Sequence, residues 1–262
     1  SSRRRHTRLL TVTGVQTCAL PISIKFIVKQ ADTVIVGNEY ERDMFARLGV
    51  ESKTRIVRNG IDLNELRVAE GNFKEKYNIG GRYFLFVGRF HESKGIDILL
   101  KALNSIKDHP QINNVMLVLM GVNDGFEEKM NQMIRDLSLE SRILIINKPQ
   151  RKDVILAYQD CEFTVLPSRW ELSPLMPLEG FAFKKPSIGT NAHGTPYTII
   201  DDKTGILVEP EDHVELGKAI IELLSDEQKR TVLGLNGYDM VMKTCNSNEM
   251  TNSILKEYEK LL

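Results

Sequence analysis

The chain is poor in cysteine and lacks a long apolar run. Its 262 residues include three cysteines, Cys18, Cys161 and Cys245, which stand far apart and without the spacing of a metal site. They indicate buried or incidental thiols of a reducing cytosol rather than a disulfide framework. No apolar run reaches the roughly 18 residues that a transmembrane helix needs, and we find no internal repeat or low-complexity segment.

The chain also has no excess of positive or negative charge, because its formal net charge is zero. Four of the 35 basic residues lie among residues 1–23, so 31 remain against 35 acidic residues in the rest of the chain. That balance gives no reason to expect nucleic acid or an anionic membrane as a partner. About 240 residues suit one α/β domain with a complete core and some additional elements.

Residues 1–23 differ from the rest of the chain. They contain four arginines and no acidic residue. Back-translation of residues 12–23 gives the codons of a widely used short-read sequencing adapter, and residues 2–8 match its outer arm in the same frame. We therefore expect residues 1–23 to be a disordered, adapter-derived artefact, with the natural sequence beginning near Ile24. The alternative, a basic arm that binds nucleic acid, would be supported by finding these codons in uncontaminated genomic DNA.

Short apolar runs alternate with amphipathic stretches from residue 83 onward. The runs predict strands at Tyr83–Val87, Val115–Met120, Ile143–Ile146, Phe163–Leu166, Ser187–Gly189 and Gly205–Val208. Apolar residues at helical spacing predict helices over residues 96–106, 126–137, 154–158 and 214–224. This alternation predicts an α/β fold with a Rossmann-like, doubly wound parallel sheet.

Two further segments flank that domain. Near the start we expect a strand at Ala31–Gly37, a helix at Glu39–Leu48 and a strand at Thr54–Arg58, with a turn at Asn59-Gly60. At the other end, apolar residues predict a helix over about Asn248–Leu262.

Residues 167–194 contain two carboxylates eight positions apart, Glu171 and Glu179. Pro174 and Pro177 lie between them and prevent one continuous helix. Pro177 suits the first residue of a new helix, so Glu179 falls in its first turn. Glu171 then lies in a strand-to-helix loop, and such loops line the ligand crevice of an open α/β sheet.

A second stretch combines a glycine turn with two cations. The strand at Tyr83–Val87 ends at Gly88-Arg89, and Lys94-Gly95 precedes a helical pattern. Cations at a helix N-terminus suit a diphosphate group. The alternative is a pair of solvated charges that flank a turn.

The two stretches, FVGRFHESKGID and PSRWELSPLMPLEG, together resemble the signature of the retaining glycosyltransferases of family 4, the glycosyl transferases group 1, which have the GT-B fold. The resemblance covers roughly residues 31–243. It implies that residues 24–62 are a remnant of the N-terminal acceptor domain and residues 63–243 the nucleotide-sugar-binding domain. Residues 244–262 would form a helix that returns toward the missing N-terminal domain.

The resemblance also implies residue roles. Arg89 and Lys94 would stabilise the leaving diphosphate, and Glu171 would hold the donor sugar and favour positive charge at its anomeric carbon. The other implied donor-binding residues are Gly88, Leu175, Met176, Glu179 and His193. Among these, Glu179 would bind the ribose hydroxyls, and the backbone amides of Leu175 and Met176 would contact the diphosphate.

Three departures from the family pattern are present. His193 and Tyr197 stand where Gly-Gly-x-Pro-Glu has a glycine and the glutamate, so we expect His193 to be a loop residue near the phosphates. Pro174 replaces a common glycine and cannot donate a hydrogen bond. Asp201-Asp202 is not a metal-binding D-x-D, and we expect no metal and no cofactor.

The implied activity is transfer of a sugar, of the retaining hexosyltransferase type, from a nucleotide-diphosphate sugar to a glycan, a lipid or a small molecule. We expect a cytoplasmic protein, with contact to the inner face of the membrane through the missing domain left open. Two alternatives remain. The fragment could bind a nucleotide sugar without catalysing transfer on its own, or the chain could be a nucleotide-sugar epimerase of the same fold.

Overall fold

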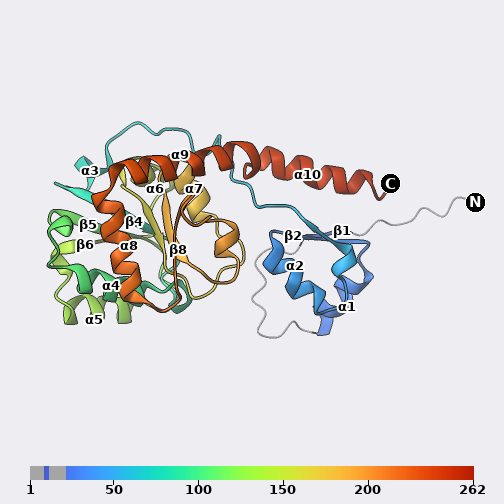
Figure 1. Ribbon diagram of the computed structural model, residues 1–262, viewed down its shortest axis with the longest axis horizontal. Coiled ribbons are helices and arrows are strands. Elements are labelled where there is room, and N and C mark those ends of the chain that lie inside the picture. Colours follow the sequence, from blue (N-terminus) through green and yellow to red (C-terminus); the bar gives the residue numbers. More distant parts are fainter. Residues whose placement is uncertain (1–8, 12–21) are drawn as a thin grey trace, which may run out of the picture.

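The computed structural model describes residues 9–11 and 22–262, which contain two parallel sheets (Figure 1). The strands are β1 (Leu9–Thr11), β2 (Thr33–Val36), β3 (Thr54–Ile56), β4 (Arg82–Val87), β5 (Val115–Gly121), β6 (Ile143–Asn147), β7 (Thr164–Leu166), β8 (Ser187–Thr190) and β9 (Gly205–Val208). The helices are α1 (Ile22–Gln30), α2 (Glu39–Ala46), α3 (Phe73–Lys76), α4 (Ile96–Ile106), α5 (Glu127–Asp136), α6 (Arg151–Asp160), α7 (Met176–Ala182), α8 (His213–Ser225), α9 (Glu227–Thr244) and α10 (Ser247–Glu259).

The large sheet has six strands in the order β6-β5-β4-β7-β8-β9, and all neighbours are parallel. Numbered along the chain, this is the doubly wound order 3-2-1-4-5-6, which confirms the predicted fold class. The direction in which the sheet grows reverses between β4 and β7, which share the register pair Leu85–Thr164. In open α/β sheets the ligand crevice lies outside the carboxyl ends of the strands at such a reversal.

Helices cover both faces of the large sheet, and β4 shows how its side chains divide between them. Phe84 and Phe86 pack with the apolar residues of α4, α5 and α8. Tyr83 and Leu85 face the opposite side and pack with α3 and α6. All four side chains are fully buried, and burying each stabilises the fold by roughly 1.5–3 kcal/mol. A strand covered on both faces reads as a continuous apolar run, which is why the sequence predicted it.

The N-terminal unit, residues 22–57 with β1, contains the small sheet β1-β2-β3 and helices α1 and α2. Its core is formed by apolar residues that include Val34, Val36 and Phe45. The predicted strand, helix and strand of this segment correspond to β2, α2 and β3. Of the segment expected to be a disordered artefact, Leu9–Thr11 pair with β2 and Ile22 begins α1, while residues 1–8 and 12–21 lie outside the described residues.

Helix α9 was not predicted from the sequence, nor were α1 and the short α3. Helix α9 packs through two glycines as well as through the buried side chains of Leu233 and Val241. A Cβ atom on Gly234 would lie 2.0 Å from the carbonyl oxygen of Lys184, and one on Gly237 would lie 2.5 Å from the ring of Phe181. Because glycines occupy two of the buried positions, the periodic apolar pattern by which sequence reasoning finds helices is weak here.

Helices α9 and α10 follow one another, and α10 extends past the large sheet toward the N-terminal unit (Figure 1). Ile61 fastens the junction, because its N–H donates to the Cys245 carbonyl (3.0 Å) and its carbonyl accepts from the Ser247 N–H (2.9 Å). Arg55 and Glu257 form an ion pair of 3.5 Å between β3 and α10. None of the helices formed by residues 22–262 has the length and apolar character needed to cross a membrane.

Gly95 joins Lys94 to α4 in a left-handed conformation, with φ at 65°. A Cβ atom there would lie 1.9 Å from the Pro167 carbonyl oxygen. We expect Gly95→Ala to lower the free energy of unfolding by more than the roughly 1–3 kcal/mol of backbone strain alone. Gly125→Ala is the control, because Gly125 also has a positive φ, 85°, but open space around its Cβ position. Equal losses of the two variants in urea unfolding would contradict a cost from the contact with Pro167.

Candidate active site

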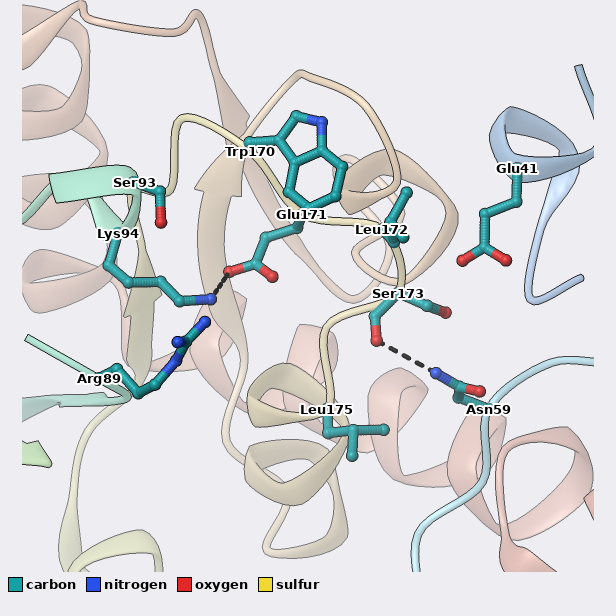
Figure 2. Close-up of a pocket in the computed structure, with 10 residues that line it drawn as sticks. All are labelled: Glu41, Asn59, Arg89, Ser93, Lys94, Trp170, Glu171, Leu172, Ser173 and Leu175. Atoms are coloured by element: carbon teal, nitrogen blue, oxygen red, sulfur yellow. Dashed lines mark hydrogen bonds and ion pairs between the residues drawn. The ribbon is translucent and has the colours of Figure 1, made fainter. Parts of the chain in front are cut away.

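A cavity of about 510 Å³ lies at the carboxyl ends of β4 and β7, where the strand order reverses. Its walls come from the loop after β4, the loop after β7 and the N-terminal unit with its connection to the large domain. The lining residues, drawn in Figure 2, are Glu41, Asn59, Arg89, Ser93, Lys94, Trp170, Glu171, Leu172, Ser173 and Leu175. All three residues predicted to be catalytic, Arg89, Lys94 and Glu171, are therefore brought together, and so is Leu175, which was predicted to bind the donor.

An ion pair joins the two loops inside the cavity. Lys94 Nζ lies 2.6 Å from Glu171 Oε1, and the side chains are only 17% and 12% exposed (Figure 2). Ser168 donates its hydroxyl to the same carboxylate oxygen at 2.8 Å. Electrostatic interactions strengthen with shielding from water. Because an ammonium group has three donors, Lys94 can also donate to an anionic ligand, which then competes with Glu171 for its positive charge.

Arg89 lies at the rim of the cavity, 62% exposed, and pairs with Asp124 at 2.8 Å. Its guanidinium end points toward Lys94 and Glu171 (Figure 2). Exposed ion pairs contribute at most about 1 kcal/mol. Arg89 can therefore exchange Asp124 for an anionic ligand at little cost, and its planar fork of donors suits phosphate oxygens.

Arg169 fastens the loop after β7 to the turn after β4. Its two terminal nitrogens donate to the two carboxylate oxygens of Asp97, each at 2.8 Å. One of them also donates to the carbonyl of Glu92 (2.7 Å), and the Arg169 backbone N–H donates to the carbonyl of Ser93 (2.8 Å). These contacts immediately flank Lys94 and Glu171, so they set the distance between the two loops.

The ionisation of this clamp follows from its geometry. Burial alone would raise the pKa of Asp97, but the hydrogen bonds and the positive charge of Arg169 lower that pKa below its usual value. Hydrogen bonds to Asp97 in turn raise the pKa of Arg169, so both groups are charged at neutral pH.

Four of the predicted site residues do not line the cavity. Glu179 is held by Arg151 (2.7 Å) and by the hydroxyl of Tyr158 (2.8 Å). The pKa of Tyr158 is raised well above its usual value by burial and by the neighbouring Glu179. Met176 is buried, and the Gly88 N–H donates to the Met120 carbonyl. The donor-binding roles of Gly88, Met176 and Glu179 stay predictions.

His193, the fourth, faces the N-terminal unit. Its Nδ1 lies 2.9 Å from the Tyr40 hydroxyl, and its ring lies 5.3 Å from that of Tyr40 and 6.3 Å from that of Trp170. Its φ of 54° explains why glycine is common at this position in the family pattern. The expectation from the sequence that His193 lies near the phosphates stays a prediction, and in the structure His193 contacts these two aromatic rings.

Sequence reasoning missed several lining residues. Trp170, Leu172 and Ser173 adjoin Glu171, so the loop motif itself was a signal for them. Glu41 and Asn59 come from far away in the chain. They approach because the N-terminal unit is bonded to the same loop, for example through Asn38 Nδ2, which donates to the Leu172 carbonyl at 2.6 Å.

The strand order and the crevice at its reversal define a Rossmann-like ligand-binding domain. Comparison with known proteins identifies the family of this domain. The family of glycosyl transferases group 1 matches residues 69–240, more than half of the chain, and the chain belongs to this family.

Three similar proteins illustrate the relationship. The chain is 28% identical over 260 residues to the uncharacterized glycosyltransferase MJ1178 of Methanocaldococcus jannaschii, covering 97% of this chain and 68% of that protein. Sucrose-phosphate synthase of Thermosynechococcus elongatus has a TM-score of 0.79 at 26% identity, over 91% of this chain and 60% of that one. HepE of Anabaena, in complex with UDP and glucose, has a TM-score of 0.81 at 18% identity, over 97% of this chain and 72% of that one. Curated relatives are longer than this chain, which spans between 36% and 70% of their length.

Asp97→Asn tests the clamp. We expect it to lower the free energy of unfolding at neutral pH by roughly 1.5–3 kcal/mol, the worth of hydrogen bonds to a charged group. Because the folded pKa of Asp97 is depressed, its contribution begins to decline near the unfolded pKa of about 3.9 and is lost as the pH falls through the folded value. Urea unfolding should therefore show the two proteins converging below about pH 4. A pH-independent difference would contradict this role. Glu211→Gln, which removes the 54% exposed second partner of Arg169, is the control with little expected effect.

Proposed function

We propose that this chain carries the donor-binding half of a retaining glycosyltransferase of family 4, which transfers a hexose from a nucleotide-diphosphate sugar to a glycan, a lipid or a small molecule. The observation that carries the proposal is the pair Lys94–Glu171 beside Arg89 in the crevice of a domain of this family. The fold shared with HepE, whose structure contains UDP and glucose, supports a nucleotide sugar as the donor.

The two cations would stabilise the leaving group. As the bond from the anomeric carbon to the diphosphate oxygen breaks, negative charge builds on the phosphate oxygens. Lys94 offers a compact positive charge inside the cavity, and Arg89 offers a planar fork of donors at its rim. In this proposal these two side chains, and not a metal ion, stabilise the negative charge on the phosphate oxygens. Because both groups are positioned before the reaction, we expect each to contribute about a hundredfold or more to turnover.

Glu171 would serve the sugar. Its carboxylate can accept hydrogen bonds from sugar hydroxyls and favours the positive charge that develops at the anomeric carbon. Glu179 would accept hydrogen bonds from the ribose hydroxyls of the nucleotide. Arg151 and Tyr158 hold that carboxylate in one orientation, so a ribose would meet a fixed acceptor.

Two other functions are separable by experiment. An epimerase of the same fold would form product from the nucleotide sugar alone, without an acceptor. A binding fragment would show affinity for nucleotide sugars and no transfer. For a transferase, nuclear magnetic resonance of the product would show the anomeric configuration of the donor, and an inverted product would overturn the retaining mechanism.

Lys94→Met tests the diphosphate site. A charge-assisted hydrogen bond is worth roughly 1.5–3 kcal/mol, so we expect the Kd of the tightest-binding nucleoside diphosphate, among UDP, GDP and ADP, to rise about 10- to 100-fold. Isothermal titration calorimetry of the full chain measures this. Lys129→Met removes a 58% exposed lysine from α5 and is the matched control. Binding by the variant as tight as by the unaltered chain would contradict the assignment, and the absence of nucleotide binding by the unaltered chain would overturn the proposed function.

Glu171→Gln separates the sugar from the diphosphate. Loss of this charge frees Lys94 for phosphate, so we expect the affinity for UDP to stay the same or to rise up to about tenfold. Any extra affinity that UDP-glucose has over UDP should shrink, because the acceptor for sugar hydroxyls is weaker. Calorimetry with both ligands gives the ratio, with Glu92→Gln, an exposed neighbour of the site, as control. Weaker UDP binding by Glu171→Gln would contradict the competition between Glu171 and phosphate for Lys94.

A further inference from the structure

Glu41 lines the cavity from the side of the N-terminal unit, and the proposed donor chemistry does not use it. It lies in the first turn of α2 and is only 3% exposed. Its Oε2 accepts a hydrogen bond from the Gly37 N–H at 2.8 Å. Part of this carboxylate therefore has a structural task, which is to hold the start of the helix.

The other oxygen of Glu41 is not used by the chain. Among the described residues, Oε1 of Glu41 has no hydrogen-bond donor and the carboxylate has no cation within ion-pair distance. Burial raises the pKa of this group, although the bond from Gly37 opposes the shift. A carboxylate oxygen that opens into a cavity takes its hydrogen bonds from water or from a bound ligand. Since Glu41 borders a cavity, a ligand can supply that donor.

The surroundings of Glu41 differ from the cationic end of the cavity. In Figure 2, Arg89 and Lys94 lie on one side of Glu171, while Glu41, Ser173 and Asn59 lie on the other. Trp170 lies beside Glu171 and lines the cavity with an aromatic ring. An aromatic face covers the C–H face of a sugar ring, while carboxylate, hydroxyl and amide groups bind its hydroxyls.

We infer that Glu41 and Trp170 form an acceptor subsite that takes an uncharged, polyhydroxylated ring, the pyranose unit of a glycan. The inference rests on the proposed function and names its acceptor class. Hydroxyl donors of such a ring satisfy Glu41 Oε1. A phosphorylated acceptor is disfavoured at this end of the cavity, because Glu41 repels an anion and the two lining cations, Arg89 and Lys94, lie on the other side of Glu171.

The test is acceptor binding to the full chain saturated with UDP. The probes are methyl α-D-glucopyranoside, methyl α-D-mannopyranoside and methyl α-D-galactopyranoside, with glucose 6-phosphate as the anionic counterpart. Trp170 is the only tryptophan of the sequence, so its fluorescence reports on the subsite directly. We expect at least one pyranoside to change this fluorescence, and glucose 6-phosphate to bind at least tenfold more weakly. We expect Glu41→Gln to weaken pyranoside binding at least tenfold and to reduce the discrimination against the phosphate.

A thermal melt distinguishes this role from a merely structural one. Glutamine keeps an oxygen for the Gly37 N–H and removes a buried charge, so Glu41→Gln should melt at the same temperature as the unaltered chain or higher. Asp43→Asn, on the same helix and 67% exposed, is the control that should leave acceptor binding unchanged. A variant that melts lower and binds pyranosides normally would overturn the inference.

The outcomes also separate the inference from the proposed function. Binding of UDP without any response to the three pyranosides overturns the acceptor subsite and leaves the donor site standing. Binding of glucose 6-phosphate as tight as that of the pyranosides overturns the preference for an uncharged ring. The absence of UDP binding contradicts the proposed function and the inference together.

Discussion

The ion pair between Arg169 and Asp97 is the constraint on which the candidate site depends. It lies where the sheet changes direction, and it connects a loop that follows β7 with the helix that follows β4. Two parallel hydrogen bonds fix the plane of the guanidinium group, which a lysine could not do. Taking both charges out of water has a cost, so such a pair contributes more to geometry than to stability. The geometry it sets is the approach of Lys94 to Glu171.

Both cations that line the cavity have a carboxylate partner within the chain, as does Arg151 outside it. Lys94 pairs with Glu171, Arg89 with Asp124, and Arg151 with Glu179. A crevice built this way concentrates charge without leaving any of these cations buried and uncompensated. Binding of an anion then becomes an exchange of partners, and its free energy is the difference between two ion-pair arrangements rather than the full worth of one.

Local features of this protein could be predicted from the sequence, and features that depend on packing between distant segments could not. The strands of the large sheet are buried on both faces and are therefore recognisable as apolar runs. Arg89, Lys94 and Glu171 lie in loops that neighbouring glycine and proline residues identify in the sequence. Helix α9 was not predicted because two of its buried positions, Gly234 and Gly237, bring the helix backbone close to its neighbours and carry no apolar side chain. Glu41 and Asn59 carry no local signal, since their role arises only when the N-terminal unit bonds to the loop after β7.

Helix α10 has thirteen residues, and none of them is buried. Isolated helices of about 12–15 residues are only marginally stable in water. Its order therefore depends on its fastened first turn beside Ile61 and on the pair of Glu257 with Arg55. The protection of the amides of α10 from hydrogen exchange would therefore be a gauge of how firmly the N-terminal unit and the large domain hold together.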